Sequence, residues 1–136
     1  MAMTLAAASG CGTPEEAAAT ADAKPDTVSL EAATTAFKDA VTKFDEAGGC
    51  LEPAPGTCWD QMEALMAPAR DLRTAMNAEN EAGPEFWSGA YALINTMEDG
   101  IKVGEDLGAS AAATNRPDVL GSAHQLADWL DANPTW

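Results

Sequence analysis

The sequence is poor in basic residues, with seven Lys and Arg against 22 Asp and Glu, which gives a formal net charge of −15. A chain this acidic repels phosphate backbones, so we do not expect it to bind nucleic acid. Its single histidine, His124, leaves too few imidazoles for most histidine-based catalytic or metal sites. No apolar run reaches the roughly 18 residues of a transmembrane helix. At 136 residues the chain is long enough for one domain.

The N-terminus carries the most specific motif. Residues 1–10 are uncharged and mostly small or apolar, which is typical of the end of a secretory signal. The sequence Ala8-Ser9-Gly10-Cys11 resembles the lipobox of bacterial lipoproteins, in which a peptidase cuts before the cysteine and the cysteine sulfur carries a diacylglycerol. The resemblance implies that residues 1–10 are a signal-peptide remnant and that Cys11 is the first mature residue and carries the lipid.

The chain has three cysteines, an odd number that leaves one over once disulfides form in an exported protein. If Cys11 is lipidated, Cys50 and Cys58 remain at the two sides of a loop rich in glycine and proline. A disulfide between them would stabilise the fold by about 2.5 kcal/mol in the chain-entropy model. It would also indicate an oxidising compartment. The alternative is two reduced cysteines near helix ends.

Residues 11–26 contain no aromatic side chain and no aliphatic one larger than alanine, so we expect a disordered tether. After it, apolar residues recur at helical spacing and predict a domain over residues 27–136. The expected fold is an all-α, antiparallel four-helix bundle, because four amphipathic segments follow one another with short links. The four helices are predicted at residues 29–47, 58–79, 84–108 and 117–131.

Several local features accompany these helices. Ser29 is the expected N-cap of the first helix, and Thr57 with Asp60 resembles a capping box for the second. Pro68 predicts a kink or break in the second helix, since proline lacks the N–H that the helix uses. One of residues 115–116 is expected to cap the fourth helix.

Charged residues are expected on the solvated faces of the helices. Asp39 and Lys43 have the spacing of an ion pair on the outer face of the first helix. The acidic pairs at 98–99 and 105–106 also predict a solvated face, because no loop with calcium-binding spacing is present.

A soft-metal site is the alternative function that the sequence leaves open. Met62 and Met66 lie one helical turn apart, and His124 could approach them from another helix. Thioethers suit Cu(I), so copper or haem handling is conceivable, although methionine on an apolar stripe is usually core filler. Asp128 lies one turn after His124 and could orient it, but such a pair is more often a surface hydrogen bond than a catalytic one.

Tryptophans stand close to helix ends. Trp59 and Trp87 lie in the first turns of predicted helices, and Trp129 lies near the end of the fourth. If they gather at one end of the bundle, they could form a surface for a partner or ligand. The alternative is that these tryptophans cover the ends of the hydrophobic core without forming a binding surface.

These observations predict an exported, lipid-anchored helical-bundle protein, held at the outer face of the cell membrane by the lipid on Cys11. We expect it to bind a partner protein or small ligand at the cell envelope without catalysis and without a cofactor. The acidic, alanine-rich composition resembles that of secreted proteins from actinobacteria. The helical body itself resembles no family.

Overall fold

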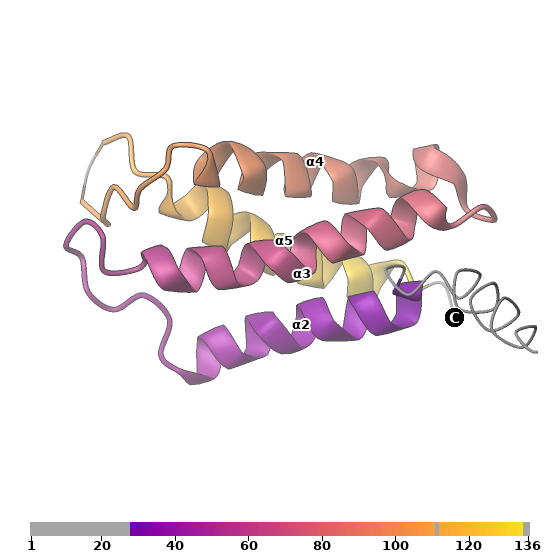
Figure 1. Cartoon of the computed structure of the whole chain (residues 1–136), viewed down its shortest axis with the longest axis horizontal. Coiled ribbons are helices and arrows are strands. Elements are labelled where there is room, and N and C mark those ends of the chain that lie inside the picture. The colour runs from indigo at the N-terminus through magenta and orange to yellow at the C-terminus, as the bar shows by residue number, and fades with distance from the viewer. Residues whose placement is uncertain (1–27, 111, 135–136) are drawn as a thin grey trace, which may run out of the picture.

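The computed structural model describes residues 28–110 and 112–134. Within these ranges the chain is entirely helical apart from turns and loops, as the periodicity predicted (Figure 1). The elements are α2 (Leu30–Glu46), α3 (Trp59–Ala78), α4 (Gly83–Ile101), a short π-helix η2 (Pro117–Gly121) and α5 (Ser122–Ala132).

The start of α2 is the one that the sequence predicted. The Ser29 hydroxyl accepts a hydrogen bond from the Ala32 N–H at 3.1 Å, which satisfies one donor of the first turn. At the other end, Gly48 and Gly49 have positive φ angles of 96° and 69°. Other residues rarely adopt this conformation, so the two glycines end the helix and turn the chain into the loop that follows.

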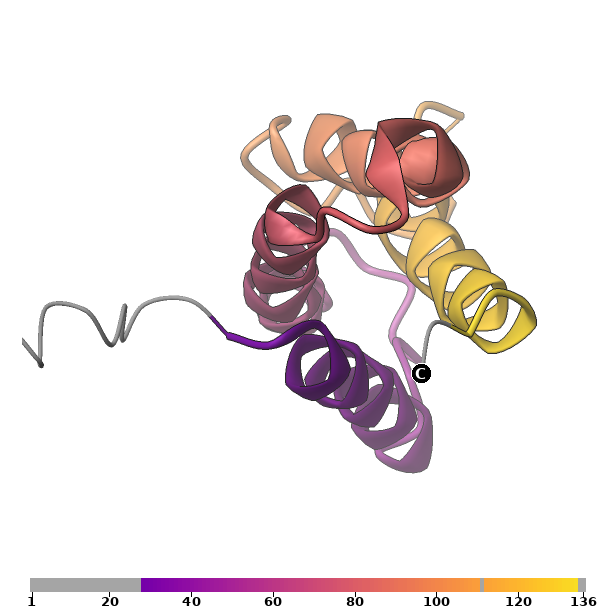
Figure 2. The ribbon, with the colours of Figure 1, turned by 90° about the vertical axis from the view of Figure 1, so that its right-hand side faces the viewer.

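The end-on view shows the four α-helices arranged around a common interior (Figure 2), and their buried apolar side chains form one hydrophobic core. Each apolar stripe contributes to this core, and α2 contacts both α3 and α5 while α4 contacts the other side of both. The largest fully buried side chains include Phe37, Leu65, Trp87, Ile94 and Leu126. These side chains come from all four α-helices, so detaching any one helix from the core would expose apolar surface to water.

The loops gather at two ends of the molecule (Figure 1). The α2–α3 loop at residues 47–58 and the α4–α5 connection at residues 102–116 lie at one end. The short α3–α4 turn lies at the opposite end. Two loops far apart in the sequence therefore meet, and they form the site described below.

The structure differs from the local predictions at three places. α3 continues through Pro68 without the break that was one of the two predicted outcomes. Thr57 does not cap α3; its hydroxyl donates instead to the carbonyls of Glu52 and Ala54. The helix predicted to reach residue 108 ends at Ile101.

Candidate functional site

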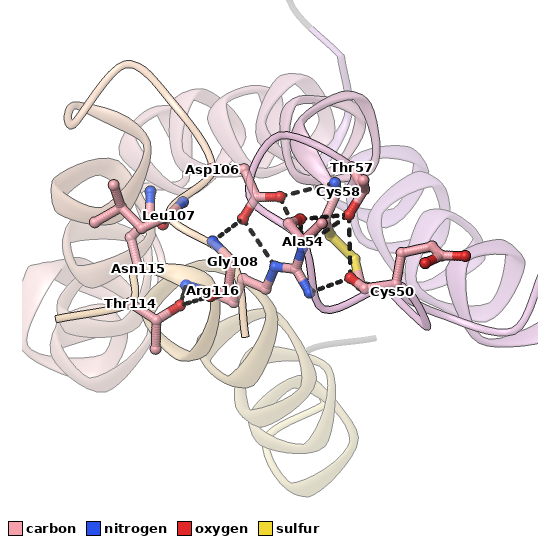
Figure 3. Close-up of a disulfide and its surroundings, with 11 residues drawn as sticks. Cys50, Ala54, Thr57, Cys58, Asp106, Leu107, Gly108, Thr114, Asn115 and Arg116 are labelled. Carbon is pink, nitrogen blue, oxygen red and sulfur yellow. Dashed lines mark hydrogen bonds and ion pairs between the residues drawn. A yellow bond between two sulfur atoms is a disulfide. The ribbon is translucent and has the colours of Figure 1, made fainter. Parts of the chain in front are cut away.

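The loop end of the molecule is closed by a disulfide between Cys50 and Cys58, whose Cα atoms are 5.5 Å apart (Figure 3). This confirms the predicted pairing. Cys58 is fully buried at the start of α3, whereas Cys50 is only partly covered. The bridge therefore fastens the α2–α3 loop to the core.

Asp106 lies beside this disulfide and is 1% exposed. Its carboxylate accepts hydrogen bonds from the Arg116 side chain, at 2.8 Å from both Nε and Nη2. It also accepts the backbone N–H groups of Cys58 at 2.8 Å and Gly108 at 2.9 Å. Arg116 holds the pKa of Asp106 far below its usual range, against the opposing effect of burial, and the two backbone donors add to the shift.

Arg116 links this carboxylate to the loop on the other side (Figure 3). Its Nη1 donates to the Glu52 carbonyl at 2.9 Å, and its Nη2 donates to the Ala54 carbonyl at 3.0 Å and the Thr57 hydroxyl at 3.1 Å. One buried guanidinium thus joins the α4–α5 connection to the α2–α3 loop. The disulfide and the ion pair hold the same loop independently.

Asn115 organises the α4–α5 connection from within. Its amide nitrogen donates to the carbonyls of Gly100 and Glu105, each at 2.8 Å, and its amide oxygen accepts the Leu107 N–H at 3.0 Å. Arg116, one of the two predicted capping residues, stands at the N-cap position of η2, but no side chain makes a capping hydrogen bond there. The side chains of Asn115 and Arg116 hydrogen-bond to loop residues instead.

The sequence analysis missed this polar cluster because it assigned residues 105–106 to a solvated helical face. Asp106 lies in a loop and is buried by its partners. A signal was present: glycines at 104 and 108 flank the acidic pair, and both adopt positive φ angles. Two such glycines four residues apart are more typical of a loop than of a helix.

A hollow of about 500 Å³ lies in the groove between α2 and α3. Its volume is within the range of small-molecule sites. Most of its lining is apolar, with the buried Leu65 and the partly buried Phe44 and Ala40. The lining residues are Ala36, Asp39, Ala40, Lys43, Phe44, Ala47, Gln61, Ala64 and Leu65.

The charged members of this lining do not form the ion pair that their spacing predicted. Asp39 and Lys43 are not among the ion pairs of the structure, and both border the hollow instead. Among the described residues, Lys43 is the one lysine or arginine whose side chain has neither a hydrogen bond nor an ion pair. The α2–α3 groove therefore combines an apolar lining with an ammonium group that has no partner in the described part of the chain.

His124 fastens α5 to the end of α2. Its Nδ1 is 2.8 Å from the Leu120 carbonyl and its Nε2 is 2.8 Å from the Asp45 carboxylate, so both ring nitrogens face acceptors. Only the imidazolium has two N–H donors, and therefore only the protonated ring makes both bonds. The predicted orienting residue, Asp128, is not the hydrogen-bond partner. It contributes only its charge.

The pKa of His124 reflects this geometry. Burial by itself lowers the pKa, but the hydrogen bonds to Leu120 and Asp45, with the charges of Asp45 and Asp128, raise it above its ordinary value. A second cross-link between the same two helices, the Lys38–Asp131 ion pair, lies two turns away along α2. The contact between α2 and α5 is thus stabilised in part by one titratable side chain, the imidazole of His124.

We expect the stability of the protein to fall as the pH rises above neutrality. His124 binds its proton more tightly in the folded state, so its contribution is complete below the unfolded pKa of about 6.5 and is lost as pH rises through the folded pKa. The side chain is 41% exposed, so the loss is at most about 1 kcal/mol. Urea unfolding at pH 6 and pH 8.5 measures it.

The control is His124→Gln, which should show no such loss over this range. Because the chain has one histidine, a single imidazole resonance in an NMR titration gives its pKa directly. A pKa at or below 6.5, or the same pH dependence in the variant, would contradict the assignment.

The three residues proposed for a soft-metal site do different things in the structure. Met62 and Met66 are 0% and 1% exposed on the core face of α3. His124 has protein partners at both ring nitrogens. In residues 28–110 and 112–134, no three His, Cys, Asp or Glu side chains gather as a metal-binding group. No contact in these ranges favours copper or haem.

Two of the three predicted tryptophans lie together. Trp87 and Trp129 have ring centroids 5.9 Å apart, and Phe86 contacts both, with centroids at 4.7 and 5.6 Å. Trp87 is 1% exposed, and Phe86 and Trp129 are partly buried and pack against the core beside it. Trp59 begins α3, at the disulfide end.

The predicted signal-peptide remnant at residues 1–10, the lipidation site Cys11 and the tether up to residue 26 lie outside the described ranges. No helix in the described part of the chain is both long and apolar enough to cross a bilayer. Comparison with protein-family models, with curated proteins and with solved structures gives no match for this chain.

Proposed function

We propose that this protein is an exported, lipid-anchored helical domain that binds a partner protein or a small ligand at the cell envelope and catalyses no reaction. In this proposal the lipid on Cys11 anchors it to the outer face of the cell membrane, and residues 12–26 are the tether. The lipobox-like sequence Ala8-Ser9-Gly10-Cys11 supports the anchor.

The observation that carries the proposal is the Cys50–Cys58 disulfide. Disulfides persist in oxidising compartments and are rare in the cytosol. The pairing also leaves Cys11 as the odd cysteine, the role that lipidation would give it. Both arguments favour a location outside the cytoplasm.

A binding role is favoured over catalysis by the way the polar groups are used. The buried Asp106 and Arg116 side chains form hydrogen bonds with each other and with two loops, and His124 joins two helices. The α2–α3 groove, in contrast, is open and apolar. We further propose that the helices form an antiparallel bundle, which the position of the loops at alternate ends supports (Figure 1).

The test is intact-mass analysis of the protein recovered from membranes of its native host. We expect a chain that begins at Cys11, carries a diacylglycerol there and has no free thiol at Cys50 or Cys58. A Cys11→Ser variant, with the disulfide intact, should leave the membrane fraction. An unprocessed chain in the cytosol with three free thiols would overturn the proposal.

A titration with Cu(I) separates this function from the copper-handling alternative. We expect no stoichiometric binding tighter than micromolar, because Met62 and Met66 are packed in the core and His124 is engaged at both nitrogens. Competition with a chromophoric Cu(I) chelator measures the affinity. Stoichiometric binding that is lost in the Met66→Leu variant would instead favour copper.

A further inference from the structure

We infer that the groove between α2 and α3 binds a single-chain aliphatic carboxylate, with the hydrocarbon on the apolar floor and the carboxylate at Lys43. The inference rests on the proposed function in one respect, that the domain acts by binding. It adds the position of the site and the chemistry of its ligand.

The shape of the groove follows from its alanines. Ala36 and Ala40 of α2, Ala47 directly after it and Ala64 of α3 all line the hollow, and side chains this short leave about 500 Å³ open between two packed helices. The stretch from Ala36 to Ala47 corresponds to about 16 Å of helix at 1.5 Å per residue. A lining that follows one helix over this length suits an extended hydrocarbon chain.

The floor of the groove provides the affinity. Its two large apolar side chains are Leu65, which is 1% exposed, and the partly buried Phe44. The position of Phe44 is supported from behind by His124, whose ring meets it edge-on with centroids 5.9 Å apart. A hydrocarbon chain laid on these side chains would remove apolar surface from water on both partners.

The positive charge of Lys43, which borders the groove, makes a carboxylate the preferred head group of the ligand. Lys43 borders the groove and has no ion-pair partner among the described residues, so its ammonium group is available to an anionic ligand. Its ammonium would meet a ligand carboxylate at the edge of an apolar surface. Asp39, one turn earlier, would oppose an anion placed on its own side, so the head group is expected at Lys43.

The experiment uses three probes with the same eight-carbon chain and different charges: octanoate, 1-octanol and octylammonium. Each is titrated into the ¹⁵N-labelled protein at constant pH and ionic strength, and amide shifts are followed by NMR. We expect octanoate to bind most tightly and to shift residues of α2 and α3 around the groove. Affinity should also rise several-fold from hexanoate to octanoate, as two further methylene groups are buried.

Four variants separate the two features of the site. Lys43→Gln should weaken octanoate about five-fold and leave octanol unchanged, whereas Lys43→Arg should restore octanoate binding. Ala64→Leu fills the groove and should weaken all three probes; leucine is a good helix former, and position 64 is exposed, so the fold is retained. Lys102→Gln removes the same charge from the C-cap of α4, which does not line the groove, and should change nothing.

Several results would overturn the inference. These are tighter binding of octylammonium than of octanoate, equal octanoate binding by the wild type and the Lys43→Gln variant, amide shifts outside the groove, or no binding of any probe. The outcome does not depend on the mass analysis above. If the protein binds octanoate but carries no lipid, only the proposed membrane anchor is rejected. If the protein is lipidated but binds none of the three probes, only the proposed ligand is rejected.

Discussion

Replacing Asp106 by Asn is expected to destabilise the fold by about 3–5 kcal/mol, the usual effect of breaking a buried ion pair by removing one partner. All four contacts of this carboxylate come from donors, so the amide nitrogen of Asn would face another N–H. The uncompensated charge of Arg116 would stay buried at the same time. Urea unfolding at pH 7 measures the loss.

A double-mutant cycle tests whether the effect belongs to the pair. Arg116→Met should be similarly severe, because it leaves the Asp106 carboxylate without its cation. The double variant Asp106→Asn/Arg116→Met should lose clearly less than the sum of the two single losses. The matched control is Arg70→Met, which breaks an ion pair with Glu98 in which Arg70 is 54% exposed, and it should lose at most about 1 kcal/mol.

The same pair predicts the acid sensitivity of the protein. The folded pKa of Asp106 is depressed, so its stabilising effect is complete above its unfolded pKa of about 3.9 and is lost as pH falls towards the folded value. Wild-type stability should therefore decrease more steeply below pH 4 than that of the Asp106→Asn variant. Parallel pH profiles of the two proteins would contradict the role given to this carboxylate.

The second large effect is expected at Gly108, where alanine should destabilise the protein by about 3 kcal/mol through strain and overpacking together. The φ angle of Gly108 is +87°, which disfavours any side chain. A Cβ atom there would also lie 2.9 Å from the Pro53 carbonyl oxygen and 3.1 Å from Pro55. That carbonyl accepts the Ala109 N–H, so the two loops would have to separate.

Gly104 provides a matched control for this substitution. Its φ angle is +88°, but a Cβ atom there would have no neighbour within 4 Å. Gly104→Ala should therefore lose only the backbone contribution of about 1–2 kcal/mol. The difference between the two variants in urea unfolding measures the contact between the loops. Equal losses of unfolding free energy in the two variants would show that the contact between the loops does not contribute to the effect at Gly108.

The sequence determined the helices because their signals are local. The apolar stripes at steps of three and four residues, the Ser29 cap and the glycines after Glu46 each act within a few residues of chain. The disulfide was also predictable, since it closes a short loop and the third cysteine has another expected role. Helix ends were less predictable, as the loss of the last two turns before Gly108 shows.

The site could not be predicted in the same way. Asp39 and Lys43 have the spacing of an ion pair, and only the packing of α2 against α3 turns both of them toward a groove. For His124 the nearby Asp128 was the obvious partner, but α2 brings Asp45 to its Nε2 from 79 positions away. Sequence spacing describes one helix at a time, so it contains no information about these partners.

The amino-acid sequence alone thus determined that the chain is helical and where most helices begin, and it favoured the Cys50–Cys58 pairing, because these depend on interactions between residues close in sequence. Only the tertiary structure decided that Asp106 and Arg116 are buried together and that the α2–α3 groove stays open. A charge is buried when a distant loop supplies its partner, and a hollow exists when two separate helices both present alanine. Both conditions arise only once the helices have packed.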